Sequence, residues 1–344
     1  MHMADALISP AVGGGMWVAS AGLIGYCARK VRACLDDRRV PLMGVLGAFV
    51  FAAQMINFSI PGTGSSGHLG GGLLLAILLG PSAAFLTIAS VLTVQALFFA
   101  DGGLLALGCN IFNLGFFPCF VAYPLVYRPL VGRDPNPGRI AVAATVAAVI
   151  GLQMGAFCVV METLLSGVSE LPFGKFLLLM QPIHLAIGVV EGLVTAAVVG
   201  FVWKARPEVL DLDRAMAPDA GGLRPVLIGL LVAAVVVGGG LSWFASTHPD
   251  GLEWAMFRTA GAGELEAPAD GAHGALAQVQ ETTALMPDYG FKAAAAEEGD
   301  AEQQPVWPAV DTGTSVAGLV GGGLTLAAAF LIGWLLKRRR QAKA

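Results

Sequence analysis

The sequence is poor in charge. Asp, Glu, Lys and Arg make up 13% of its 344 residues, about half the share found in an ordinary soluble domain. Hydrophobic residues reach 56%. This balance excludes a soluble enzyme. The five cysteines include no Cys-x-x-Cys pair, so neither a disulfide framework nor a zinc knuckle is indicated.

Two further absences concern targeting and nucleotide binding. No basic region precedes the first apolar block and no small-residue cleavage site follows a short one, so the sequence predicts no cleavable signal peptide. We therefore expect Met1 and His2 to remain in the mature protein. The Gly-rich loop 62–68 lacks the Gly-Lys-Ser/Thr ending of a phosphate-binding loop. If this protein concentrates a solute against a gradient, the ATPases must be separate chains.

Long uncharged apolar blocks dominate the sequence. At about 20 residues per membrane-spanning helix, they hold about nine crossings. We therefore predict an all-α integral membrane protein. The blocks are 10–28, 40–67, 69–100, 102–127, 140–161, 176–190, 226–247 and 312–336.

Lys and Arg gather in four clusters between these blocks, and basic loops stay on the cytoplasmic side. The clusters run from Arg29 to Arg39, from Arg128 to Arg139, from Lys204 to Arg224 and from Lys337 to Lys343. This pattern predicts an extracytoplasmic N-terminus and a cytoplasmic C-terminus in the cell (inner) membrane. Three crossings fit between the Gly-rich loop and Arg128, with turns at Gly80-Pro81 and Asp101-Gly102-Gly103.

The same pattern predicts the domain organisation. Residues 1–206 form a seven-helix bundle, 207–225 a cytoplasmic linker, and 226–344 a two-helix module. The two helices of that module flank an extracytoplasmic segment, 247–311, which carries twelve acidic residues against two basic ones. This acidic segment is also rich in Ala and Gly, and we expect it to be only partly ordered.

The predicted topology places Met1, His2 and His68 on one face. A free terminal amine, the backbone nitrogen of His2 and its imidazole Nδ1 can close two fused chelate rings around a metal, and His68 can supply a fourth nitrogen. Planar nitrogen ligation suits Ni(II) or Cu(II). Spacing alone leaves a plainer alternative open, because a histidine at position two is common and a loop histidine is usually solvated.

Four further polar residues are predicted close enough to orient a ligand imidazole. These are Asp5, Ser65, Ser66 and Asp101.

Three ionisable residues fall at membrane depth, where a charge is costly and often functional. Glu162, His184 and Glu191 could form a proton relay or an intramembrane catalytic site, and His184 and Glu191 share one helix face. The alternative is a set of structural polar contacts between helices, which we favour.

Five groups of motifs stand out in the first 206 residues. They are Met1 to Asp5 with Ile8-Ser9-Pro10, Ala53 to Phe58 with Gly62 to His68, Ala76 to Pro81, Phe99 to Gly103 with Gly108 to Asn113, and His184 to Gly188 with Glu191-Gly192 and Thr195. These motifs resemble those of the substrate-specific membrane component of nickel and cobalt energy-coupling-factor (ECF) transporters, the NikM/CbiM family. They occur in the family's order across all seven predicted helices.

This resemblance implies a function and partners. The family's ligands carry over onto Met1, His2 and His68, with Ni(II) or Co(II) as the transported substrate and no organic cofactor. The protein itself would not be an enzyme. An ECF coupling subunit (NikQ/CbiQ-like) and ATPase subunits (NikO/CbiO-like) would drive uptake across the lipid bilayer, and no nucleic acid is involved. A stand-alone secondary metal permease is the other transport hypothesis.

Two motifs stand out in the last third, Pro249 to Trp254 and Pro287-Asp288-Tyr289. On these motifs the last third resembles the two-helix accessory subunit NikN/CbiN. Residues 260–310 are longer and richer in Ala and Glu than the family pattern needs. The Gly-rich loop and the fused accessory segment look more like the nickel branch, while the choice between nickel and cobalt stays open.

Overall fold

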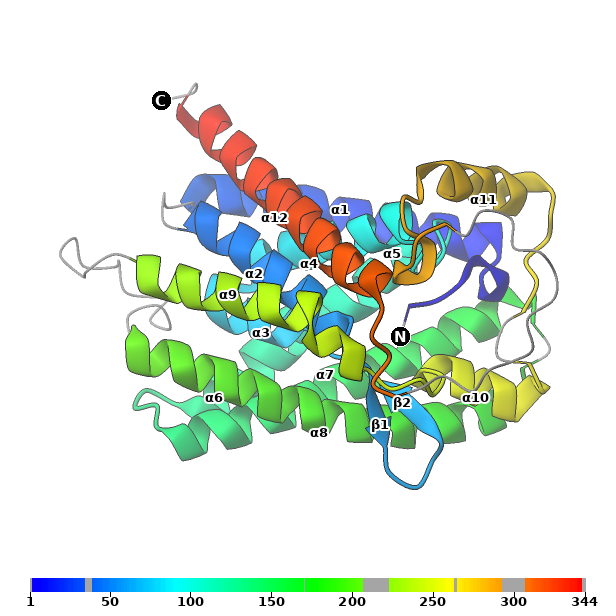
Figure 1. Ribbon diagram of the computed structural model, residues 1–344, viewed down its shortest axis with the longest axis horizontal. Helices are drawn as coiled ribbons and strands as arrows, with labels where there is room; N and C mark the ends of the chain where they lie inside the picture. The colour runs from blue at the N-terminus through cyan, green and yellow to red at the C-terminus, as the bar shows by residue number, and fades with distance from the viewer. Residues whose placement is uncertain are drawn as a thin grey trace.

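The computed structural model describes residues 2–34, 39–169, 171–206, 223–262, 265–292 and 307–341. Within them the protein is an elongated bundle of helices (Figure 1). The helices are α1 (Pro10–Cys34), α2 (Arg39–Gln54), α3 (Gly72–Leu79), α4 (Pro81–Phe98), α5 (Leu107–Ile111), α6 (Arg128–Val131), α7 (Pro137–Ser166), α8 (Phe173–Ala205), α9 (Arg224–Gly239), α10 (Gly251–Ala260), α11 (Gly271–Thr283) and α12 (Thr312–Gln341).

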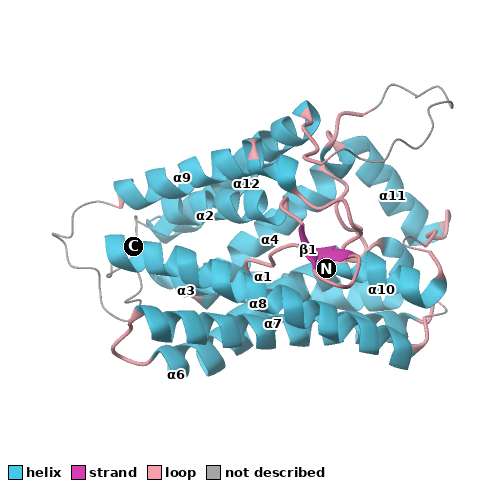
Figure 2. Ribbon diagram, turned by 60° about the horizontal axis from the view of Figure 1, so that its bottom comes forward, coloured by secondary structure: helices cyan, strands magenta, loops and turns pink. Residues whose placement is uncertain are grey.

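Short elements connect these helices. A π-helical stretch, η2 (Phe112–Tyr127), joins α5 to α6, and it contains Pro118 and Pro124, which have no N–H to donate to a regular α-helical ladder. The 3-10 turns are η1 (Asp5–Leu7), η4 (Leu241–Phe244) and η5 (Pro287–Tyr289). Strand β1 (Phe58–Ile60) pairs antiparallel with β2 (Ser65–Gly67), and Figure 2 shows this hairpin beside the N-terminus.

Six described helical stretches are long and apolar enough to cross a membrane. They are 10–33, 81–98, 107–131, 137–166, 173–205 and 312–339. Their outward faces carry large exposed apolar side chains, such as Leu178 and Val142, as expected of surfaces in contact with lipid. The protein is therefore a multi-pass, predominantly helical membrane protein. The two shorter apolar helices, α2 and α9, each have 16 residues.

The third predicted crossing differs from a regular helix. Helix α3 has only eight residues, and non-helical chain leads into it from β2. Buried non-helical backbone needs polar partners, and two side chains supply them. Glu191 accepts hydrogen bonds from the backbone N–H groups of Gly70 (2.8 Å) and Gly71 (3.2 Å), and Gln54 Nε2 donates to the Gly70 carbonyl (2.8 Å).

Helices α9 and α12 pack against α2 and against each other. Glycines allow these close approaches: a Cβ on Gly321 would overlap the Phe51 ring of α2, and one on Gly318 would overlap the backbone of Gly238 in α9. Residues 207–222 of the predicted linker lie outside the described residues, and α9 begins at Arg224. The acidic segment contains α10 and α11, so its described parts have more regular structure than expected.

The bundle has two distinct ends. The first described residues, the hairpin, α10 and α11 lie at one end, and α12 finishes at the opposite end (Figure 1). We call the first the hairpin end. The described basic residues of the four clusters lie where α1, α8 and α12 finish and where α2, α6, α7 and α9 begin. These boundaries all belong to the end away from the hairpin, so the charge pattern correctly grouped the helix ends.

Candidate metal centre

The first residues of the chain are anchored inside the hairpin end. Met3 is fully buried. Its backbone N–H donates to Asn110 Oδ1 (2.8 Å), and its carbonyl accepts from Asn110 Nδ2 (3.2 Å) and from the Gly103 N–H (2.9 Å). Asp5 accepts a hydrogen bond from the Ala106 N–H (2.9 Å). These bonds hold the preceding residue, His2, at a fixed position in the protein interior.

His2 and His68 meet face to face. Their ring centroids are 5.0 Å apart and the ring planes differ by 9°. His2 Nδ1 lies 3.2 Å from Asp101 Oδ1, while His2 Nε2 is buried and has no hydrogen-bond partner among the described residues. His68 Nδ1 lies 3.1 Å from the Leu69 carbonyl, and its Nε2 lies 4.0 Å from Asp250 Oδ2.

Burial keeps both imidazoles neutral. It lowers the pKa of His2 and the pKa of His68 to about 3. The neutral ring has a lone pair that can bind a metal, whereas the imidazolium has none. Burial also raises the pKa of Asp101, an effect that the hydrogen bond from the Tyr289 hydroxyl partly offsets.

The C-terminal module contributes a carboxylate to this site. Asp250 caps α10 and accepts from the N–H groups of Leu252 and Glu253 through Oδ1 (2.8 Å each), which leaves Oδ2 facing His68. Burial would raise the pKa of Asp250, but the positive charge of the amino terminus and the electrostatic effect of His68 outweigh it and hold this pKa well below its usual range.

Two further contacts tie the C-terminal module to the loop that carries His68. The Ser66 N–H donates to the Pro249 carbonyl (2.8 Å), and Trp254 Nε1 donates to the Thr63 carbonyl (3.0 Å). Tyr289, which donates a hydrogen bond to Asp101, also belongs to this module. The C-terminal module therefore contacts residues next to both histidines.

The structure brings His2, His68 and Asp101 together, and Met1 lies outside the described residues. The other three predicted orienting residues make different contacts. Asp5 holds Ala106, Ser65 bonds Thr63 (2.9 Å), and Ser66 bonds the accessory module. Sequence reasoning missed Asn110, Tyr289 and Asp250. Asp250 lies in a visible helix-capping pattern, Pro-Asp-Gly-Leu-Glu, but that pattern does not reveal what the helix covers.

The three membrane-depth residues have separate partners. Glu162 accepts from Asn113 Nδ2 (2.7 Å), Glu191 holds the backbone of Gly70 and Gly71, and His184 Nδ1 bonds the Met180 carbonyl (2.8 Å). Two of these sites are structural contacts of the kind expected between packed elements. His184 differs, because its Nε2 is buried without a partner among the described residues.

The backbone of Gly103 lies very close to Asp5 in the N-terminal segment, and we predict that position 103 does not tolerate a side chain. A Cβ on Gly103 would overlap the Asp5 carboxyl group and lie 2.5 Å from the Asp5 nitrogen. Gly103→Ala should therefore displace the N-terminal segment at a cost of about 1 to 3 kcal/mol, which corresponds to about 5- to 150-fold weaker Ni(II) binding if the site bears the strain. The measurement is a titration of Ni(II) into the Gly103→Ala variant. The matched control is Gly14→Ala, because a Cβ at position 14 meets nothing within 4 Å. Equal affinities for the two variants would contradict this prediction.

A helical membrane bundle that buries two neutral imidazoles beside carboxylates offers donor groups of the kind that bind a divalent metal ion. Residues 2–209 match the family model CbiM, described as the cobalt uptake substrate-specific transmembrane region, and residues 224–338 match the PDGLE domain model. The chain belongs to the CbiM family, with a PDGLE domain after it. This confirms the resemblance seen in the sequence and supports a transporter rather than an enzyme.

Individual relatives agree with this assignment. The chain is 31% identical over 310 residues to the fused nickel transport protein NikMN of Rhodobacter capsulatus, covering 84% of this chain and 88% of that protein. It is 38% identical over 210 residues to a protein of Haloquadratum walsbyi named for metal transport, covering 61% and 93%. A crystal structure of a truncated transition metal transporter aligns with a TM-score of 0.53 and 31% identity, covering 60% of this chain and 99% of that one.

Proposed function

We propose that this protein is the substrate-binding component of an ATP-driven ECF-type transporter that imports Ni(II) or Co(II). The ion is captured at the hairpin end by the terminal amine of Met1, the backbone nitrogen and imidazole of His2, and the imidazole of His68. The observation that carries this proposal is the buried, parallel pair of neutral imidazoles, whose ring centroids are 5.0 Å apart.

The chemistry of the donors supports capture of a divalent ion. An amine, a backbone nitrogen and Nδ1 of one N-terminal His form two fused chelate rings, and a second imidazole completes four nitrogen ligands. Such a set favours Ni(II) over Co(II). Asp101 lies 3.2 Å from His2 Nδ1, so an ion on this nitrogen would have a carboxylate beside it to balance its charge. The family and relative names include both nickel and cobalt, and the donor set leads us to favour nickel.

The proposed orientation and organisation follow from the grouped basic helix ends. The hairpin end is extracytoplasmic and the basic end is cytoplasmic. Residues 1–206 form the ion-binding bundle, 207–225 the linker, and 226–344 the accessory module. Because the sequence has no phosphate-binding loop, a coupling subunit and ATPase subunits of the ECF type supply the energy.

Calorimetric titration of the purified full-length chain tests this function. With an unmodified Met1, the protein should bind one equivalent of Ni(II), and more tightly than it binds Co(II). Uptake in cells should require co-expressed coupling and ATPase subunits. An absence of Ni(II) and Co(II) binding would overturn the proposal, and metal uptake by this chain alone would replace it with the stand-alone permease.

A further inference from the structure

Two buried polar side chains lie beside the His2 ring. Its Nδ1 is 3.2 Å from Asp101 Oδ1. The second side chain is Gln95: burial and the positive amino terminus lower the pKa of His2 to about 3, and an interaction with Gln95 acts in the opposite direction. His2 Nε2 and Gln95 Oε1 are both buried without a hydrogen-bond partner among the described residues. The two atoms are complementary, because a protonated ring nitrogen donates and an amide oxygen accepts.

Hydrogen bonds fix which way the Gln95 amide points. Gln54 Nε2 donates to the Gly70 carbonyl (2.8 Å), and since a carbonyl only accepts, the Gln54 oxygen is the atom left for Gln95. Gln95 Nε2 donates to that oxygen (2.9 Å), so Gln95 Oε1 points elsewhere. The Tyr289 hydroxyl also interacts with Gln95, but it donates its one proton to Asp101. Gln95 Oε1 therefore still needs a donor.

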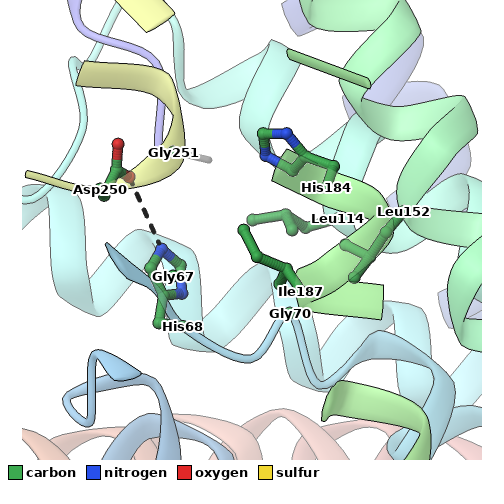
Figure 3. Close-up of a pocket in the computed structure, with 9 residues that line it drawn as sticks. All are labelled: Gly67, His68, Gly70, Leu114, Leu152, His184, Ile187, Asp250 and Gly251. Carbon is green, nitrogen blue, oxygen red and sulfur yellow. Dashed lines mark ion pairs between the residues drawn. The ribbon is translucent and has the colours of Figure 1, made fainter. Parts of the chain in front are cut away.

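The position of Gln95 is rigid. The residue is fully buried near the end of α4, and its backbone carbonyl accepts from the Asp101 N–H (3.2 Å). The glutamine pair also reaches the loop of the second proposed ligand, because Gly70 and His68 line one small cavity (Figure 3). The two glutamines therefore connect the loop that carries His68 to the side chain beside His2.

Metal binding by His2 requires one particular tautomer. The proposed chelate ring contains Nδ1, so this nitrogen must offer its lone pair to the ion. A neutral imidazole carries one proton, which must then lie on Nε2. A buried N–H without an acceptor is costly, and a metal-binding histidine nearly always donates its second N–H to an oxygen. Gln95 Oε1 is a buried oxygen beside this ring that lacks a donor.

We propose that Gln95 is a positioning residue for ion capture, which accepts the Nε2 proton of His2 and so holds the tautomer whose Nδ1 binds the ion. This inference rests on the proposed function. Asp101 competes for the same proton at Nδ1, and the ring keeps one proton whichever oxygen accepts it. Gln95 thus favours the form of His2 that binds a metal, and Asp101 favours the form that does not.

Titration of Ni(II) into two full-length variants tests this role. Gln95→Met has a side chain of similar length without the oxygen, and it should bind Ni(II) about 10- to 100-fold more weakly than the wild-type chain. Gln95→Glu keeps an oxygen for Nε2 and, when protonated, a donor for Gln54, so it should recover most of this loss. A purely structural contact between helices predicts no such recovery.

Gln153→Met is the matched control. It removes a glutamine hydrogen bond between α7 and α8, from Nε2 to the Gln181 carbonyl (2.7 Å), and it should leave the Ni(II) affinity unchanged. The proposal is overturned if Gln95→Met binds Ni(II) as tightly as the wild-type chain, or if Gln95→Glu binds it as weakly as Gln95→Met does.

Nitrogen NMR of histidine-labelled protein locates the proton directly and needs no variant at position 95. A planar Ni(II) complex is diamagnetic, so the His2 ring remains observable, and its signals are those missing from His2→Ala. The wild-type chain with Ni(II) should carry a slowly exchanging proton on His2 Nε2, and an Nε2 without a proton would overturn the role of Gln95. The proposed function fails on a different result, which is the absence of Ni(II) and Co(II) binding by the wild-type chain.

Discussion

Adding four residues before Met1 should weaken Ni(II) binding by on the order of 10² to 10³-fold. The extension moves the primary amine away from His2 and leaves a peptide nitrogen in its place, which removes the amine ligand and the chelate ring that it closes with the His2 nitrogen. Sites with four ligands bind with about 10 to 16 kcal/mol, so one ligand contributes about 2.5 to 4 kcal/mol, or on the order of 10² to 10³ in affinity. The extension also adds bulk just before Met3, which is fully buried.

The control for this experiment is the same four residues added after the C-terminus, because α12 finishes at the end of the bundle opposite the hairpin (Figure 1). That form should bind Ni(II) as the unmodified chain does. A protease-removable extension gives a second check, because cleavage back to Met1 should restore binding. Tight Ni(II) binding by the N-terminally extended chain would show that the terminal amine is not a ligand.

The sequence predicts the main features of this fold because membrane physics acts on composition directly. Uncharged blocks of about 20 residues must be helical in lipid, since no water satisfies the backbone there. The clusters of Lys and Arg then group the helix ends correctly. The interruption before α3 is harder to predict, because the backbone of Gly70 and Gly71 depends on Glu191, 120 residues later in the chain. A buried glutamate in an apolar helix indicates a polar contact without naming its partner.

The candidate site is predictable to the same limited extent. His2 and His68 follow from the N-terminal pattern and from the turn that carries the second histidine. Asp250 and Tyr289 do not, because they reach the site only after the accessory segment folds over the hairpin. Local patterns show that Asp250 begins a helix. Such patterns hold no information about the distance between Asp250 and His68, which lies 182 positions earlier in the sequence.

His68→Ala should weaken Ni(II) binding by on the order of 10² to 10³-fold, again the contribution of one ligand among four. Three nitrogens of the N-terminus would remain, so weaker metal binding should persist. The preference among metal ions should then move toward an ion that tolerates an open coordination position. The visible absorption of the Ni(II) complex reports this change. Four planar nitrogens give a characteristic absorption band, and this band shifts when water replaces the fourth nitrogen. The measurement is a pair of titrations, one calorimetric and one spectroscopic.

His248→Ala is the matched substitution for His68→Ala. His248 is an exposed histidine at the same end of the molecule, and it contacts Ser66 only through its backbone carbonyl (2.8 Å), so its imidazole can be removed without disturbing the hairpin. Its Ni(II) affinity and absorption should equal those of the wild-type chain. If both variants bind Ni(II) equally well, His68 is not a ligand. The parallel stacking of His68 on His2 would then be a packing contact that keeps the N-terminal segment in place.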